Sequence, residues 1–81
     1  MNITYDMAKN AINHRKHGVD LADVEGVFYE DRDHDEERFV TLGMDGFGRL
    51  LAVAYHYRGE DEIRVISARL AEPHERRAYE G

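Results

Sequence analysis

The stretch that decides the fold is Arg49-Leu50-Leu51-Ala52-Val53-Ala54-Tyr55-His56-Tyr57, a long apolar run with strand-forming residues. It follows the turn signal Asp45-Gly46-Phe47-Gly48, and the segment before that turn, Arg38 to Met44, is also rich in β-formers. Two such runs on either side of a glycine-containing turn predict a β-hairpin.

The hairpin is extended by a third predicted strand. The turn Arg58-Gly59-Glu60-Asp61 leads into Glu62 to Leu70, whose centre, Ile63 to Arg69, contains β-branched side chains. The sequence therefore predicts a three-stranded antiparallel meander. A short edge strand around Val27 to Tyr29 would bring the sheet to four strands.

Helices are predicted on both sides of these strands. Asp6 is placed to cap a first helix that Gly18 terminates, and Asp20 caps a second, shorter helix through Val27. Pro73 suits the first turn of a last helix over 74–80. The predicted order is ααβββα, an α+β fold with helices packed on one face of an antiparallel sheet. The length of 81 residues favours one domain over 1–81.

The composition limits the class of protein. The absence of cysteine excludes disulfides, thiolate metal sites and a cysteine nucleophile, and it suits a reducing compartment. The first residues lack the basic and apolar regions of a secretory signal, and no apolar run approaches the roughly 20 residues that span a bilayer. We therefore expect a cytoplasmic protein without a membrane partner.

The charge is distributed unevenly. The net charge of −6 argues against nucleic-acid binding, whose footprint is usually basic. Nine of the 17 acids, however, lie between Asp20 and Glu37, whereas the six bases after residue 40 are all arginines. We expect an acidic surface that faces away from an arginine-bearing sheet and last helix. Arginine suits oxyanion recognition, although ordinary salt bridges explain such a bias about as often.

The acidic stretch from Glu30 to Glu37 resembles the start of a calcium loop, because Asp31, Asp33 and Asp35 alternate. The pattern fails at the sixth loop position, where glycine is required and Glu36 stands, and at the twelfth, where Leu42 replaces the bidentate acid. A solvated loop is the simpler interpretation.

Other motifs for metal or nucleophilic chemistry are weak. His14 and His17 lie three apart on the first predicted helix, but no third ligand follows at a defined spacing. Ser67, the only serine, has no nucleophile-elbow motif around it, and no glycine-rich phosphate loop is present. We expect neither a metal nor a cofactor.

Arginines and a tyrosine remain as candidates for function. Arg64 interrupts the apolar run of the third strand, where a charge is either solvent-exposed or paired with a carboxylate. Arg64 and Arg69 are five apart, so they point to opposite faces of a regular strand and to the same face only if a bulge intervenes. Arg76 and Tyr79 are three apart and share a face of the last helix, although a core tyrosine is the simpler interpretation of Tyr79.

Several segments, taken in order, resemble the BrnT toxin family of bacterial toxin–antitoxin systems. They are Tyr5-Asp6 with Lys9-Asn10, Arg15-Lys16-His17-Gly18-Val19, Val27-Phe28, Arg38-Phe39-Val40-Thr41-Leu42-Gly43, Gly48 to Tyr55, Ile63 to Arg69 and Glu75-Arg76-Arg77-Ala78-Tyr79. The resemblance covers nearly the whole chain. It implies a RelE-like fold, ribonuclease activity that arrests translation, and neutralisation by a BrnA-type antitoxin that carries its own DNA-binding domain. The complex would repress its own operon, and it is compatible with a homodimer of the toxin inside a hetero-oligomer.

Such a ribonuclease would need no metal if side chains supplied the chemistry. The 2′-hydroxyl must lose a proton, the phosphate oxygens must be stabilised, and the 5′-oxygen must be protonated. The predicted catalytic residues are Arg64, Arg69, Arg76, Tyr79 and His17, and the predicted RNA-binding residues are Lys16, Arg49 and Arg77. The arginines would stabilise phosphate, while His17, Lys16 or Tyr79 could handle protons. His17 is the type of side chain that exchanges protons near neutral pH, but at a helix C-terminus it could equally bind phosphate as a cation.

The acidic balance keeps two alternatives open. One is a non-catalytic interaction module that uses the same surface to bind a DNA-binding partner protein. The other is a small acidic adaptor unrelated to RNA. The Lys16-His17-Gly18 and Ile66-Ser67-Ala68-Arg69 segments favour the ribonuclease.

Overall fold

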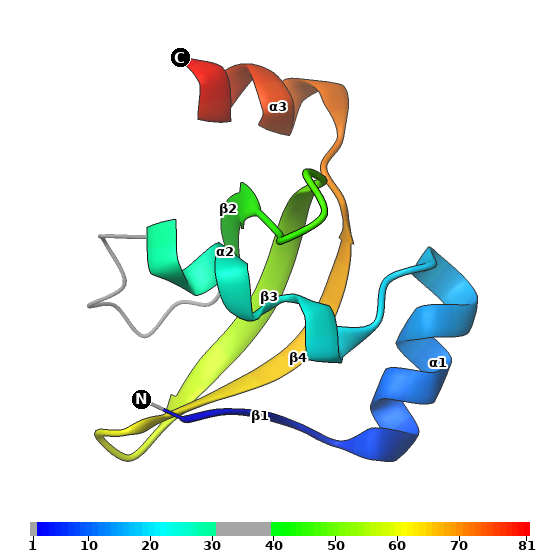
Figure 1. Ribbon diagram of the computed structural model, residues 1–81, viewed down its shortest axis with the longest axis vertical. Helices are drawn as coiled ribbons and strands as arrows, with labels where there is room; N and C mark the ends of the chain where they lie inside the picture. Colours follow the sequence, from blue (N-terminus) through cyan, green and yellow to red (C-terminus); the bar gives the residue numbers. More distant parts are fainter. Residues whose placement is uncertain (1, 31–39) are drawn as a thin grey trace.

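The computed structural model describes residues 2–30 and 40–81 (Figure 1). The elements in chain order are β1 (Asn2–Tyr5), α1 (Met7–His17), the 3-10 turn η1 (Leu21–Asp23), α2 (Glu25–Glu30), β2 (Val40–Met44), β3 (Leu50–Arg58), β4 (Glu62–Leu70) and α3 (Pro73–Glu80). The three predicted meander strands, the first helix and the last helix are therefore confirmed. Residues 38 and 39, which the prediction gives to the first strand, lie outside the described residues.

The sheet is mixed, so the prediction of a purely antiparallel sheet is wrong. Its strand order is β1-β4-β3-β2, with β2, β3 and β4 antiparallel and β1 parallel to β4. The four-residue β1 is too short to show a strand period in the sequence. Its parallel pairing is possible because α1 and the elements after it provide the long crossover that parallel strands require.

The second predicted helix is divided. Asp20 caps η1 as expected, but η1 ends at Asp23 and α2 starts at Glu25. The edge strand predicted around Val27 to Tyr29 is wrong, because these residues are helical. The buried residues of this segment, Val24, Val27 and Phe28, follow the three- and four-residue spacing of a helix face.

The core lies on one face of the sheet. Side chains from η1, α2 and the loop before η1 pack against alternate residues of β3 and β4. The core residues are Val19, Leu21, Val24, Val27, Phe28, Leu51, Val53, Tyr55, Ile63, Val65 and Ala68. We call this face of the sheet the inner face and the opposite one the outer face.

The three helices do not all pack on one face, which corrects the predicted arrangement. Figure 1 shows α2 across the sheet, α1 to one side of it and α3 beyond one end. None of the residues of α3 is buried. Within the described residues no helix has the length and apolarity needed to cross a membrane. The core cluster therefore lies on the inner face, and α3 adds no buried residue to it.

Candidate functional site

A β-bulge in β4 decides which side chains share a face. The β3–β4 register pairs Ala54 with Ser67 but Tyr55 with Val65, so Ile66 has no opposite residue in β3. One extra residue reverses the alternation of faces in the remainder of a strand and re-aims the bulged side chain.

The bulge brings Arg64, Ser67 and Arg69 to the outer face together. The buried side chains of β4 are those of Ile63, Val65 and Ala68. The three polar residues alternate with this buried set on both sides of the bulge. The sequence predicts that Arg64 and Arg69 share a face only if this strand contains a bulge. β4 contains that bulge, and the two arginines do share a face.

A pocket of about 280 Å³ opens beside Arg64. We call it the arginine pocket; it is lined by Asp6, Lys9, His56, Arg58, Arg64, Val65 and Ile66. His56 lies directly opposite Arg64 in the β3–β4 register. Three permanent cations and one carboxylate line this pocket, so it favours an anion despite the negative charge of the whole chain.

The Arg64 side chain is held only loosely inside the protein. Its Nε lies 3.9 Å from Oε2 of Glu62, while the Thr4 hydroxyl donates a hydrogen bond to the same oxygen at 2.6 Å. A guanidinium presents five N–H donors, and the long ion pair engages one edge of it. Arg64 is therefore suited to bidentate binding of a phosphate.

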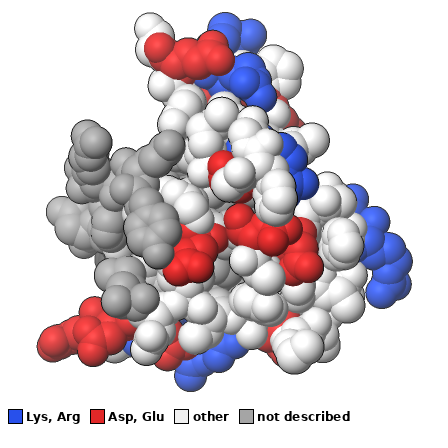
Figure 2. Space-filling model, in the orientation of Figure 1, with Lys and Arg blue, Asp and Glu red and all other residues white. Residues whose placement is uncertain are grey.

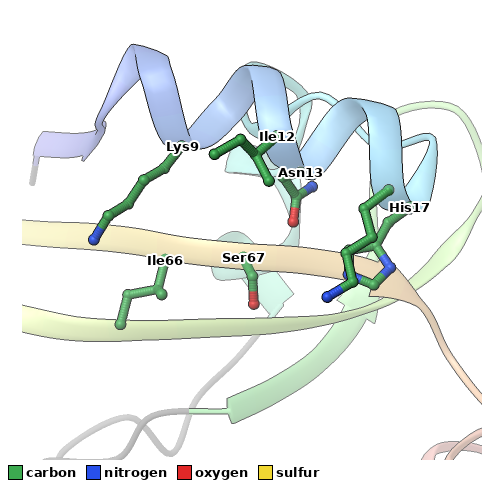
Figure 3. A pocket seen from close by; sticks show the side chains of 7 residues that line it. Lys9, Ile12, Asn13, His17, Ile66 and Ser67 are labelled. Carbon is green, nitrogen blue, oxygen red and sulfur yellow. The ribbon is translucent and has the colours of Figure 1, made fainter.

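A second pocket, of about 250 Å³, adjoins the first between α1 and β4 (Figure 3). We call it the α1–β4 pocket; it is lined by Lys9, Ile12, Asn13, Lys16, His17, Ile66 and Ser67. Lys9 and Ile66 line both pockets. The two pockets thus form one groove, which contains Arg64, Lys16 and His17 from the predicted site.

Two asparagines fix the position of α1, since Asn13 ties it to β4 and Asn10 ties it to the start of η1. The buried Asn13 amide donates to the carbonyl oxygens of Val19 at 2.8 Å and Ala68 at 3.0 Å, and its oxygen accepts from the Ala68 N–H at 3.0 Å. Asn10 donates to Asp20 at 2.8 Å and accepts from the Leu21 N–H at 2.7 Å. These contacts fix the wall of the groove.

The ends of α1 follow the predicted caps. Asp6 accepts a hydrogen bond from the Ala8 N–H at 3.3 Å, and Gly18 ends the helix with a left-handed φ of 73°. Eight residues separate Lys9 from His17, and a helix rises about 1.5 Å per residue, so these side chains start about 12 Å apart. His17 therefore lies at the far end of the groove from the arginine pocket, in line with Figure 3.

The candidates on and near α3 lie apart from the groove. Arg69 donates two hydrogen bonds to Glu75, at 2.7 and 2.9 Å, and these bonds lower the pKa of Glu75 to about 2. The same bonds raise the pKa of Arg69. The other predicted residues of α3, Arg76, Arg77 and Tyr79, are exposed and line neither pocket of the groove.

Arg49 also lies elsewhere. Its Nε pairs with Asp45 Oδ2 at 2.7 Å, and its guanidinium carbon is 5.6 Å from the centre of the Phe47 ring. Burial opposes ionisation of Asp45, but hydrogen bonds from Arg49 and from the Phe47 N–H keep the pKa of this carboxyl low. Arg49 thus stabilises the β2–β3 turn and lines a different pocket, with His14 and Asp20.

The groove contains residues that the sequence reasoning missed. Lys9 precedes Lys16 by seven residues, so both lie on one helix face. This spacing in the sequence indicates that Lys9 belongs to the same site as Lys16. His56 and Arg58 alternate along β3, but only the pairing of β3 with β4 places them next to Arg64. The sequence alone could not supply that pairing.

Of the acids between Asp20 and Glu37, the structure describes four: Asp20, which caps η1, Asp23 in η1, and Glu25 and Glu30 in α2. Figure 2 shows Asp and Glu side chains across the middle of the face that carries these elements, with Lys and Arg at its margins. Asp20 accepts hydrogen bonds from the Ala22 N–H and from Asn10, which lower its pKa. Both Asp20 and Asp23 line the pocket of Arg49, not that of Arg64. Residues 31–37, the rest of the predicted acidic surface, lie outside the described residues.

The possible metal sites considered from the sequence gain no support from residues 2–30 and 40–81. No group of three or more His, Asp or Glu side chains in these ranges is arranged to hold a metal ion. His14 and His17 line different pockets. The calcium-like run Asp31, Asp33 and Asp35 lies outside the described part of the chain.

Comparisons with known proteins identify the family. No curated protein matches the chain. The structure is similar to the 1.1 Å crystal structure of the Brucella abortus ribonuclease toxin BrnT, with a TM-score of 0.71 and 29% sequence identity over 89% of this chain and 97% of that one. The family model described as the ribonuclease toxin BrnT of type II toxin–antitoxin systems matches residues 5–75. The chain therefore belongs to the BrnT family of ribonuclease toxins of type II toxin–antitoxin systems.

Proposed function

We propose that this BrnT toxin is a metal-independent endoribonuclease that inhibits translation and cleaves RNA in the arginine pocket. The observation that carries the proposal is the placement of His56 directly opposite Arg64, in a pocket that also contains Lys9 and Arg58. This arrangement combines a proton-transfer group with cations that can bind phosphate.

The reaction follows from these groups. His56, in its neutral form, accepts the proton of the 2′-hydroxyl as the 2′-oxygen attacks the adjacent phosphorus. Arg64 and Lys9 stabilise the negative charge that develops on the phosphate oxygens. The bond from phosphorus to the 5′-oxygen breaks, which leaves a 2′,3′-cyclic phosphate and a 5′-hydroxyl whose proton comes from His56 in its protonated form or from water. Because the cations stabilise this charge, the proposal requires no metal.

The other predicted residues take part outside this centre. Lys16 and His17 lie about 10 to 12 Å along α1 from Lys9, so we assign them to binding of a neighbouring nucleotide. Arg69, Arg76, Arg77 and Tyr79 are candidates for contacts with RNA that continues along the outer face. Arg49 is a candidate only for RNA that reaches the β2–β3 turn.

The regulatory part of the proposal involves a BrnA-type antitoxin. A type II toxin implies an antitoxin partner, and the proposed antitoxin binds this chain and represses their operon as a complex. With a net charge of −6, the toxin is itself poorly suited to bind operator DNA. We therefore expect the antitoxin to make the DNA contacts, so that operator binding is seen with the complex or the antitoxin and not with the toxin alone.

The test of catalysis uses purified toxin and single-stranded RNA in chelator at low salt. We expect Arg64→Gln to lower kcat/KM by about 10²–10³-fold and His56→Ala to lower kcat by about 10²–10⁴-fold. His17→Ala should raise KM and leave kcat nearly unchanged. Arg15→Gln, an exposed α1 arginine outside the groove, is the matched control and should cleave as the wild type does.

Each result decides between the functional alternatives. Equal cleavage by the wild type and Arg64→Gln would overturn the assignment of the arginine pocket. A loss of kcat in His17→Ala but not in His56→Ala would move the proton transfer to the other end of the groove. A toxin that binds its antitoxin but cleaves no RNA would instead be the non-catalytic interaction module.

A further inference from the structure

The α1–β4 pocket combines two exposed apolar side chains with lysines. Ile12 is 58% exposed and Ile66 is 42% exposed, although both are large hydrophobic residues. The bulge in β4 places Ile66 at this pocket and leaves it out of register with β3. Lys9 and Lys16 add methylene stems that extend the apolar wall, together with ammonium groups that favour an anion.

Among the polar residues of this pocket, Asn13 is fixed by hydrogen bonds. Both amide hydrogens of Asn13 and its oxygen are engaged with the backbone of Val19 and Ala68, so Asn13 forms a rigid wall. The Ser67 hydroxyl and the His17 ring are the remaining side chains that can hydrogen-bond to a ligand as donor or acceptor. A pocket that combines apolar walls with hydrogen-bonding side chains is typical of a small-molecule site.

The size and position of the pocket narrow the choice of ligand. Its volume of about 250 Å³ lies below the roughly 300–1,000 Å³ of pockets that hold drug-sized molecules, so it suits one ring system. Because it shares Lys9 and Ile66 with the arginine pocket, its occupant would be adjacent to a phosphate held by Arg64.

We propose that the α1–β4 pocket binds the nucleobase of a nucleotide that flanks the scissile phosphate, and so determines the sequence preference of cleavage. This inference rests on the proposed function of the arginine pocket. The base packs against Ile12 and Ile66, as extruded bases pack against apolar side chains in other enzymes. Ser67 and His17 hydrogen-bond to its edge, while Lys9 and Lys16 bind the neighbouring phosphates.

The first test measures binding without any cleavage. The chain has four isoleucines, of which Ile12 and Ile66 line the pocket, whereas Ile3 and Ile63 do not. In NMR spectra of toxin with labelled isoleucine methyl groups, ribonucleoside monophosphates should shift the first two signals and leave the other two nearly unchanged. Ribose 5-phosphate, which lacks a base, should leave the Ile12 signal nearly unchanged and shift at most Ile66, which also lines the arginine pocket. Equal shifts with both ligands would overturn the proposal.

The second test compares two substitutions on α1. Ile12→Ser removes one apolar wall and should weaken nucleotide binding about tenfold, as loss of a base-stacking partner does in single-strand binding proteins. Met7→Ser is the matched control, because Met7 is 79% exposed and lines neither pocket. Both variants should remain folded since both positions are exposed. Equal binding by the two variants would also overturn the proposal.

The third test concerns sequence preference. End-sequencing of RNA fragments should show that Ser67→Ala changes the nucleotide frequencies beside the cleaved bond. If the wild-type toxin is active but neither Ser67→Ala nor Ile12→Ser changes the nucleotide frequencies beside the cleaved bond, the base pocket is refuted and the nuclease assignment stands. An inactive wild type that still gives base-dependent isoleucine shifts would refute the nuclease assignment and support the pocket.

Discussion

At the scale of single residues, Asn13 takes the place of a neighbouring strand beside β4. The parallel pairing of β1 with β4 ends at Tyr5 and Val65. Three residues further on, the Asn13 amide forms the two hydrogen bonds to Ala68 that a strand partner would form. The side chain thereby satisfies buried backbone groups at the edge of the sheet and ties α1 to the groove.

Removal of this amide should destabilise the protein. Asn13→Ala leaves the N–H and carbonyl of Ala68 and the carbonyl of Val19 without these partners, so we expect a loss of about 2–4 kcal/mol in the free energy of unfolding. Urea denaturation followed by circular dichroism measures it. Asn2→Ala, at an exposed asparagine, is the control and should change stability by less than about 0.5 kcal/mol. Similar losses for both variants would refute this role of Asn13.

At the scale of elements, α3 depends on a few specific contacts, because none of its residues is buried. Glu75 makes the principal side-chain contact: it accepts two hydrogen bonds from Arg69 and one from the Glu72 N–H at 2.8 Å. The last of these also forms part of a capping box at the start of the helix.

The low pKa of Glu75 makes this contact sensitive to acid. The pKa falls from 4.5 in the reference state to about 2 in the folded protein, so the stabilisation is complete above about pH 4.5. It is lost progressively as the pH decreases to about 2.

In hydrogen-exchange experiments, Glu75→Gln should reduce protection of the α3 amides about tenfold at neutral pH, since hydrogen bonds to charged groups contribute about 1.5–3 kcal/mol. Glu80→Gln, which removes an exposed carboxyl 3.8 Å from Arg76, should have little effect. Equal protection in both variants would contradict the prediction.

The packing of α2 on β2 requires a glycine at position 43. A Cβ atom at Gly43 would lie 2.9 Å from Val27 Cγ1 and 3.1 Å from the Val27 carbonyl oxygen. Gly43→Ala should therefore separate α2 from β2 and lower the free energy of unfolding by about 1–3 kcal/mol. Gly46→Ala is the matched control, because nothing lies within 4 Å of a Cβ there. Thermal unfolding of the two variants provides the comparison, and equal midpoints would show that the close approach has no energetic effect.

At the scale of the whole molecule, the charge of −6 coexists with a basic groove. The described acids of η1 and α2 lie with the elements that cover the inner face, whereas Arg64 lies on the outer face. Local cations can therefore bind RNA while the average field of the protein repels it, and screening by salt weakens both effects.

The salt dependence of RNA binding should report the local cations. If Lys9 and Arg64 share the scissile phosphate while Lys16 and Arg58 contact one further phosphate each, the slope of log K against log salt should be about −2 for single-stranded RNA, at about −0.7 per phosphate contacted. Lys16→Gln should make this slope less steep by about 0.7. Fluorescence anisotropy of labelled RNA, recorded between about 50 and 200 mM salt, measures the slope for each of the two proteins. A slope near zero, or one that Lys16→Gln leaves unchanged, would show that the groove does not bind the phosphates.

Local signals in the sequence predicted most of the elements. Asp6 and Gly18 define α1 because capping depends on residues within one turn of the helix end. The turn glycines and the β-rich runs define β3 and β4 for the same reason, and the predicted bounds of the third strand agree with Glu62–Leu70. The family resemblance also followed from the sequence, and the family model confirms it.

The tertiary structure alone decided the sheet order and the composition of the groove. β1 is stable as a strand only because β4 provides its partner 60 residues later, and no signal within four residues encodes such a pairing. The bulge at Ile66 likewise exists only relative to β3, yet it places Arg64 and Arg69 on one face and His56 opposite Arg64. The sequence by itself determined the first and last helices, the meander strands and the kinds of side chain available for RNA chemistry. Which of those side chains meet was determined by long-range strand pairing, because register depends on contacts between residues far apart in the chain.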